Sequence, residues 1–343
     1  MESMTNTPPE PATTTAPAGD SSGPQRTTRQ ITPVGPFDLA VALDYVRSWT
    51  GSTFEGVDDA ADTPEGEAGR WRRALRLHDI DLLLTLRGAT PEEQHSNMGN
   101  RLWLDIATPL ATPTAFAGAA DAAELRLRRI FSLDTDPADF HAFAVSEPLL
   151  AELVARQPLL RPVLVADPFE ALLWAVLGQQ INVTFARTLK LRLVDLVGRT
   201  LEVDGASARM MPLAEDVALL EPDALRAIQF SRQKIDYVLT LSQAVATGEL
   251  DLAAVAQMPP EDAIATLTAR RGVGRWTAEY MLMRAFGHPD ALPAGDVSLQ
   301  LLIGTALLGR RATEAELRQA TAHWSPWRGW SAFHVWANRQ FGG

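Results

Sequence analysis

The sequence contains no cysteine, no long apolar run and no lysine after residue 267. Without cysteine the chain has no disulfide, no thiolate zinc site and no cysteine-ligated iron–sulfur cluster. No stretch approaches the roughly 18 consecutive apolar residues of a membrane-spanning helix. The first thirty residues also lack the apolar core of a secretory signal. With 46% hydrophobic residues, the composition therefore predicts a globular protein of the cytoplasm that has no membrane partner.

Negative charge dominates the chain but is distributed unevenly. The net charge is −11, which is unfavourable for a protein that binds a polyanion. Residues 268–343 nevertheless carry nine arginines against five acids, a net +4, whereas the remaining residues sum to −15. Any nucleic-acid-binding surface is therefore expected in the C-terminal part.

The 343 residues suffice for two or three packed domains after an N-terminal tail. Residues 1–30 are rich in Thr, Pro, Ser and Ala and have no periodicity, so we expect them to be disordered. Such a tail could tether a partner, but a passive extension is the simpler reading. We expect an N-terminal α/β sheet domain over residues 31–117 and a helical region in two lobes over residues 118–343.

The N-terminal domain is expected to hold one helix and a small antiparallel sheet. Apolar residues recur at helical spacing over 36–49, and alternating patterns over 71–77, 80–86 and 102–106 are typical of strands. Glycines and the polar stretch 97–100 separate these runs. This part of the sequence contains no group of residues that indicates catalysis.

From residue 119 the pattern is almost wholly helical, with helices expected over 119–133, 137–146 and 147–156. A further helix is expected to begin at Asp167, with Asp167 as N-cap, Pro168 at the first position and Glu170 reaching back as a capping-box partner. This helix ends at a polar break that contains Gly178 and Gln180, and another helix is expected over 184–197.

Residues 259–300 contain the most informative pattern. Apolar residues at helical spacing lie on both sides of Gly272-Val273-Gly274, which predicts a helix, a tight hairpin and a second helix. A helix that starts at such a hairpin directs unpaired amide groups outward and attracts phosphate. Arg270, Arg271 and Arg275 would add positive charge. Taken alone, Gly-Val-Gly is better explained as an ordinary connection between helices, because turns use glycine routinely.

Asp296 follows the second helix, in a turn rich in proline and glycine that precedes another apolar helix. Taken by itself, this aspartate is best explained as the N-cap of that helix. A carboxylate beside a sugar could also stabilise the positive charge that develops when an N-glycosidic bond breaks. Both readings stay open at this point.

The order of helix, glycine hairpin, helix, loop and aspartate resembles the helix-hairpin-helix DNA glycosylase superfamily. The segment G-V-G-R-W-T-A-E-Y is followed by L-P-A-G-D and then by S-P-W-R and H-V-W. These motifs are similar to those of one branch, the bacterial AlkA-type 3-methyladenine DNA glycosylase II enzymes. The similarity extends from about residue 31 to the end. It implies an α+β fold, with a small antiparallel-sheet domain followed by an all-helical helix-hairpin-helix glycosylase body and a cleft between the helical lobes.

The resemblance also implies site residues and an activity. Asp296 matches the catalytic aspartate, and Trp276, Tyr280 and Trp336 match walls of the pocket for an extruded base. Gly272, Gly274 and Arg275 would bind the DNA backbone, and Gln180 matches the residue that fills the gap left in the duplex. At each of these positions a structural role is the alternative: the tryptophans could be core residues, and Gln180 could be a solvated turn residue.

Bifunctional members of the superfamily carry a lysine nucleophile at the position of Trp276. We therefore expect base release by hydrolysis, without cleavage at the abasic site. The resemblance implies no organic cofactor, but family hairpins hold a monovalent cation, Na⁺ or K⁺, through main-chain carbonyls, here those of Thr268, Arg270 and Gly272. The expected partner is duplex DNA with alkylated bases, bound by a monomer associated with the nucleoid.

Two other functions remain open from the sequence. A non-catalytic protein could use the hairpin to recognise damaged DNA, although retention of Asp296 argues against that. A glycosylase for oxidised bases is disfavoured by Trp276 in place of the lysine.

Overall fold

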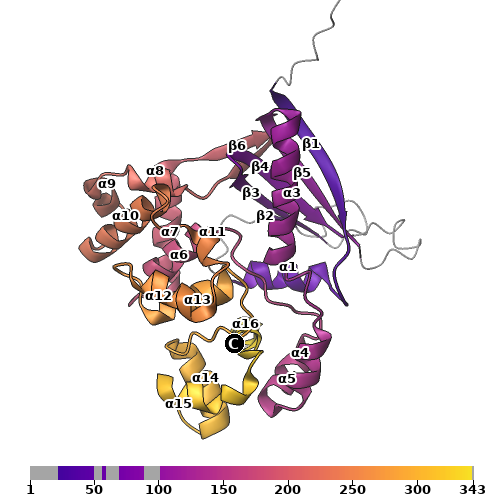
Figure 1. Cartoon of the computed structure of the whole chain (residues 1–343), viewed down its shortest axis with the longest axis vertical. Coiled ribbons are helices and arrows are strands. Elements are labelled where there is room, and N and C mark those ends of the chain that lie inside the picture. The colour runs from indigo at the N-terminus through magenta and orange to yellow at the C-terminus, as the bar shows by residue number, and fades with distance from the viewer. Residues whose placement is uncertain (1–21, 50–55, 59–68, 89–100, 342–343) are drawn as a thin grey trace, which may run out of the picture.

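The structure is a computed structural model that describes residues 22–49, 56–58, 69–88 and 101–341. A five-stranded antiparallel sheet forms one end of the molecule and helices form the rest (Figure 1). The strand order is β1-β5-β4-β3-β2. The strands are β1 (Gly23–Ile31), β2 (Gly56–Asp58), β3 (Arg70–Leu77), β4 (Ile80–Arg87) and β5 (Leu102–Ala111). The predicted α+β class is confirmed, with the sheet first and the helical body after it.

Strand β1 corrects the expected extent of the tail. Residues 23–31 pair with β5 in antiparallel register, from Gly23 opposite Ala111 to Ile31 opposite Leu102. The prediction of disorder is therefore wrong for residues 23–30, because tertiary pairing outweighs a composition poor in apolar side chains. Residues 1–21 of the predicted tail and the polar stretch 97–100 lie outside the described residues.

The sheet is covered on both faces. Helix α3 (Pro113–Ile130) packs on one face with α1 (Leu39–Ser48) at its end (Figure 1). The hairpin of β6 (Thr200–Val203) and β7 (Ala206–Arg209) packs on the other face. This hairpin corrects the expectation of an all-helical second part, and the expected boundary at residue 117 falls inside α3. Short strands inside a long helical pattern are a weak periodicity signal.

The helical body follows in chain order, and the helices expected from the sequence are present. Within the described ranges, no helix is both long and apolar enough to span a lipid bilayer. The helices are α4 (Ala138–Val145), α5 (Pro148–Arg156), α6 (Pro168–Leu177), α7 (Val183–Val197), α8 (Ala214–Ala218), α9 (Pro222–Ala227), α10 (Arg232–Ala246), α11 (Leu252–Val255), α12 (Pro260–Thr268), α13 (Arg275–Arg284), α14 (Val297–Leu308), α15 (Glu314–Ala320), the 3₁₀ turn η2 (Ala322–Trp324) and α16 (Arg328–Phe341).

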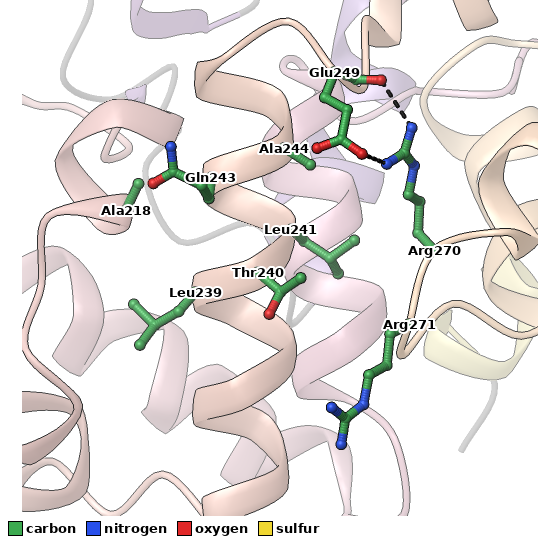
Figure 2. Close-up of a pocket in the computed structure, with 9 residues that line it drawn as sticks. All are labelled: Ala218, Leu239, Thr240, Leu241, Gln243, Ala244, Glu249, Arg270 and Arg271. Carbon is green, nitrogen blue, oxygen red and sulfur yellow. Dashed lines mark hydrogen bonds and ion pairs between the residues drawn. The ribbon is translucent and has the colours of Figure 1, made fainter.

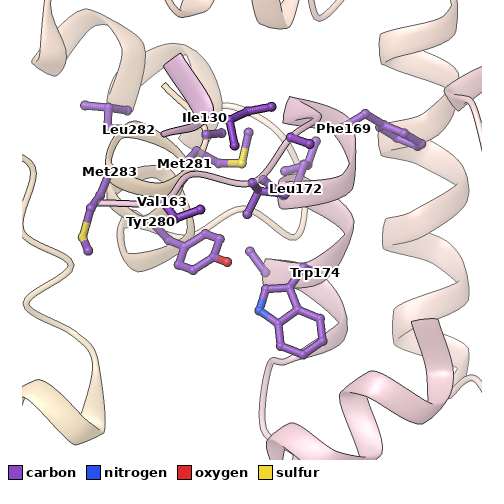
Figure 3. Close-up of a cluster of buried hydrophobic side chains, with 14 of the residues drawn as sticks. Ile130, Val163, Phe169, Leu172, Trp174, Tyr280, Met281, Leu282 and Met283 are labelled. Carbon is purple, nitrogen blue, oxygen red and sulfur yellow. The ribbon is translucent and has the colours of Figure 1, made fainter. Parts of the chain in front are cut away.

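Helix α6 is buried from Phe169 to its end and forms the centre of the body. Its side chains pack against α13 and against the segment before α6, which contributes Val163; Figure 3 shows Leu172 and Trp174 of α6 beside Tyr280 of α13. Asp167 is the N-cap as expected and accepts hydrogen bonds from the amides of Phe169 and Glu170. The continuous apolar surface explains why this helix lacks a polar side.

Glu170 does not form the predicted capping box. Its carboxylate instead accepts hydrogen bonds from Arg73 of β3 and from Lys190 of α7, and all three side chains are at most 3% exposed. Burial alone would raise the pKa of Glu170, but the charges of Arg73 and Lys190 hold that pKa below its ordinary value. The first turn of α6 is thus joined to the sheet and to α7 by buried charge.

We expect Glu170→Gln to destabilise the fold strongly, because it leaves two cations buried with one neutral acceptor. Breaking a buried ion pair by removal of one partner costs about 3–5 kcal/mol. The matched control is Glu152→Gln, which breaks an exposed pair with Arg156 and should cost under about 1 kcal/mol. Urea unfolding of both variants measures the two costs. Equal, small losses would show that the buried group contributes little to stability.

Candidate active site

The Gly-Val-Gly segment forms the predicted tight hairpin between α12 and α13. Gly272 has φ +88°, and a Cβ added there would lie 2.5 Å from Cγ of Tyr237 in α10. Gly274 has extended backbone, and a Cβ there would meet nothing within 4 Å. Gly272 is thus required by conformation and packing, whereas Gly274 leaves open space beside the start of α13.

The start of α13 is suited to bind an anion. Gly274 is its N-cap and has no side chain to cap the first turn, so the first amide groups of this helix are suited to accept an anion as partner. The flanking arginines are paired with acids: Arg271 with Asp236 at 3.2 Å, and Arg275 with Glu279 at 2.9 Å. The positive charge expected here is therefore partly balanced in the free protein.

A small pocket of about 400 Å³ lies between α10 and this hairpin (Figure 2). Arg270 closes one side of it through a hydrogen bond of 2.8 Å to the carbonyl of Glu249 and an ion pair with the same residue. Arg271 extends away from that pair (Figure 2). Among the described residues that line it, Glu249 carries the one carboxylate, and that carboxylate is paired with Arg270.

A larger pocket of about 1150 Å³ lies on the other side of the hairpin. It is lined by the end of α1, the α6–α7 loop, the hairpin and α13, the start of α14, and Trp336 of α16. Asp296, Trp276, Tyr280, Trp336, Gly272, Gly274 and Gln180 all line it. Of the residues that the sequence predicted for the site, Thr268, Arg270, Arg271 and Arg275 do not line it. The structure therefore brings the predicted site together.

Asp296 is both a helix cap and a pocket residue. Its Oδ1 accepts hydrogen bonds from the amides of Ser298 and Leu299, both at 2.9 Å, and from Nε1 of Trp336 at 3.2 Å. Asp296 is thus the N-cap of α14, as one of the two interpretations predicted. This capping role does not exclude a catalytic role for the same side chain. Within the described ranges no group donates to Oδ2, which leaves one carboxylate oxygen for a ligand in the pocket.

Three aromatic rings line the pocket next to this carboxylate. Trp276 stacks on Tyr280 with centroids 5.6 Å apart and an interplanar angle of 30°, and Tyr280 lies 6.3 Å from Trp336. Burial raises the pKa of the Tyr280 hydroxyl above its ordinary value, so this group stays neutral. Trp324 is instead fully buried outside the pocket, as expected for a structural residue.

The pocket residues that were not anticipated include Tyr45 and Trp49 of α1, Trp174 of α6, and Arg284 of α13. Trp49 and Trp174 meet edge to face at 6.1 Å. The N-terminal domain thus contributes to the site, which sequence analysis missed because nothing in the α1 pattern separates a pocket residue from a core residue. Arg284 did carry a signal, since it is a charged residue on a helix that is buried all round.

Gln180 lies at the tip of the α6–α7 loop with φ +57° and an exposed side chain. Left-handed backbone is uncommon for glutamine, and such a conformation persists only where the surroundings hold it. The side chain of Gln179 supplies one constraint, because its Nε2 donates to the carbonyl of Gly272 at 2.9 Å. The loop is therefore attached directly to the hairpin.

Lys234 of α10 supplies the second constraint. Its Nζ is buried and donates to the carbonyls of Val176, Leu177 and Gln179 at 3.1, 2.8 and 2.9 Å. These carbonyls belong to the end of α6 and to the loop after it, where a cation is favoured by the helix dipole. Burial lowers the pKa of this lysine below its ordinary value.

The monovalent cation inferred from resemblance stays a prediction. The carbonyl of Gly272 accepts from Gln179, and the carbonyl of Arg270 accepts from the amide of Val273 at 3.1 Å. Each carbonyl oxygen has a second lone pair, so these hydrogen bonds do not decide whether a cation binds. Among the described residues, no group of three or more His, Cys, Asp or Glu side chains could hold a metal ion.

Comparison with known proteins places the chain in a family. Residues 173–326 match the model of the HhH-GPD superfamily base excision DNA repair protein. A DNA-3-methyladenine glycosylase of Bacillus subtilis is 35% identical over 207 residues, which are 60% of this chain and 68% of that protein. The chain belongs to this superfamily. The resemblance to its AlkA-type branch that the hairpin motifs indicated is thereby confirmed.

Two further similarities concern the extent of the match. A probable bifunctional transcriptional activator/DNA repair enzyme AlkA of Mycobacterium tuberculosis is 34% identical over 269 residues, covering 78% of this chain and 50% of that protein. The chain thus matches half the length of that relative. The structure of a 3-methyladenine DNA glycosylase from Archaeoglobus fulgidus superposes with a TM-score of 0.74 at 18% identity, over 91% of this chain and 99% of that one, which shows the same fold.

We expect Gly272→Ala to disrupt the hairpin, because the added Cβ meets both a left-handed backbone and the Tyr237 ring. Gly248→Ala is the matched control: its φ is +74°, but its Cβ would meet nothing within 4 Å. The control should lose about 1 kcal/mol of stability, and Gly272→Ala about 1–3 kcal/mol more. Melting curves and affinity for duplex DNA measure both effects. Equal losses would mean that contact with Tyr237 does not matter.

Proposed function

We propose that this AlkA-type glycosylase flips alkylated bases of the 3-methyladenine and 7-methylguanine type out of duplex DNA and excises them by hydrolysis in base excision repair. The observation that carries the proposal is one free carboxylate oxygen, on Asp296, in the wall of an aromatic pocket large enough for a purine. The names of the relatives support the substrate class. We propose that the protein acts as a monomer associated with the nucleoid.

Binding is assigned to the hairpin and the α6–α7 loop. The uncapped start of α13 receives a DNA phosphate, with Gly274 leaving room for the close approach and Arg275 adding charge. Base extrusion costs a few kcal/mol of stacking and pairing. Gln180 fills the vacated space, because its strained backbone presents an exposed side chain at the mouth of the pocket.

Chemistry is assigned to Asp296. Breaking the N-glycosidic bond leaves positive charge on the sugar, and a fixed carboxylate stabilises that charge without reorganising. The two amides of α14 and the indole of Trp336 hold Oδ1, so Oδ2 faces the sugar and orients the attacking water. A base that is already cationic leaves as a neutral molecule, so no general acid is required.

Asp296→Asn should lower the excision rate by roughly 10²–10³-fold and leave affinity for abasic-site DNA within a few-fold. Asparagine caps helices about as well as aspartate, so the fold should persist. Asp251→Asn is the matched control, since Asp251 caps α11 through two amides at 2.9 Å and does not line the pocket. Base release from methylated duplex DNA, followed by chromatography, gives the rates. Full activity of Asp296→Asn would remove the carboxylate from the mechanism.

We also propose that the enzyme lacks lyase activity at abasic sites. The chain contains only two lysines, Lys190 and Lys234; both are buried, both are hydrogen-bonded, and neither lines the pocket. Borohydride reduction during turnover should therefore trap no covalent protein–DNA complex, whereas a bifunctional glycosylase treated in parallel should be trapped. A trapped band that disappears in Lys234→Gln would contradict the proposal and identify the nucleophile.

A further inference from the structure

A guanidinium is buried at the inner end of the pocket. Arg284, the last residue of α13, is 2% exposed and lines the pocket. Its Cζ lies 5.6 Å from the ring centre of Tyr45, 4.7 Å from that of Trp49 and 5.4 Å from that of Phe333. Three aromatic rings thus offset part of the cost of burying this charge, and the faces that they turn to Arg284 are not available to a base.

The rings do not satisfy the hydrogen-bonding capacity of this group. Within the described ranges, Arg284 forms no ion pair, and its buried Nη1 makes no hydrogen bond. The Tyr280 hydroxyl is also buried without a partner of ordinary hydrogen-bond geometry. The two groups are within reach of one another, since both the charge of Arg284 and a side-chain contact from it oppose part of the rise in the Tyr280 pKa, but that contact lies outside ordinary hydrogen-bond geometry. Buried donors without partners are rare and mark places where a ligand or water binds.

Among the residues that the structure describes, Asp296 and Arg284 are the only charged ones in the lining. They act in opposite directions on an extruded base. A carboxylate favours positive charge at the sugar and on the base, whereas a guanidinium disfavours a cationic base and can donate to a carbonyl oxygen. Since the interior has a low dielectric constant, neither effect is screened as it would be in water.

We propose that Arg284, together with the Tyr280 hydroxyl, is a specificity-determining site that binds the carbonyl edge of the extruded base and reduces the preference of the pocket for cationic over neutral lesions. This inference rests on the proposed glycosylase function. On this inference the aromatic walls stack on any extruded base, and Arg284 at the inner end of the pocket discriminates between bases by their charge.

The test compares duplexes with one lesion, either 7-methylguanine or hypoxanthine. Both bases are 6-oxopurines, but only the first is cationic in DNA. Single-turnover excision by Arg284→Met should raise the ratio of 7-methylguanine to hypoxanthine rates at least tenfold. Arg284→Lys keeps the charge and should leave the ratio within threefold of wild type. Melting curves and affinity for an abasic-site analogue establish that each variant is folded.

A folded Arg284→Met whose ratio stays within threefold of wild type would overturn the inference. If that variant does not fold, Arg284→Gln, which removes the charge and keeps an amide, must meet the same tenfold criterion. Tyr280→Phe removes the hydroxyl oxygen and tests binding of the base carbonyl separately. This variant should slow the release of hypoxanthine at least threefold relative to the release of 1,N⁶-ethenoadenine, which has no carbonyl. An unchanged ratio there would also contradict the inference. Wild type that releases none of these bases would refute the proposed function itself.

Discussion

Buried charge at both ends of α6 is the constraint on which the rest of the structure depends. The only two lysines of the chain hold this helix: Lys190, with Arg73, binds Glu170 in its first turn, and Lys234 binds the carbonyls at its end. Buried ionic groups gain little net stability over apolar packing but allow few alternative arrangements. A helix that is apolar on all sides could otherwise shift or rotate in the core, so we infer that these contacts fix its register.

The position of α6 determines where several residues of the candidate active site lie. Trp174 enters the pocket from α6, and the loop after α6 carries Gln180 to the mouth of the pocket. The same loop is attached to the hairpin through Gln179. The large pocket, the exposed Gln180 side chain and the uncapped start of α13 are therefore connected through α6 and the hairpin. Under the proposed function these three features hold the base, fill the gap in the duplex and receive a phosphate. Base extrusion requires that these three act at fixed distances from one another.

The sequence predicted the local features of this arrangement and missed those that depend on long-range contacts. The glycine hairpin, the cap at Asp167 and the strands β3 to β5 follow from periodicity and turn chemistry. Strand β1 and the contribution of α1 to the pocket could not be predicted, because each depends on a partner that is distant in the sequence. Glu170 was misassigned for the same reason. It lies three residues after the N-cap, so the local pattern predicts a capping box. Buried cations from β3 and α7 instead attract its carboxylate more strongly.

Asp296 shows why structural and catalytic readings need not exclude one another. Capping α14 occupies one carboxylate oxygen and leaves the other without a donor among the described residues, so the interaction that stabilises the helix is compatible with the catalytic role that we propose. Charge is also partly compensated at the start of α13, the proposed DNA-binding end, where Arg271 and Arg275 are paired with acids in the free protein. A phosphate must compete with those acids, which weakens non-specific attraction to DNA. In a chain with net charge −11, affinity then has to come from the uncapped amides of α13 and from an extruded base that fits the pocket, and both depend on the position of α6.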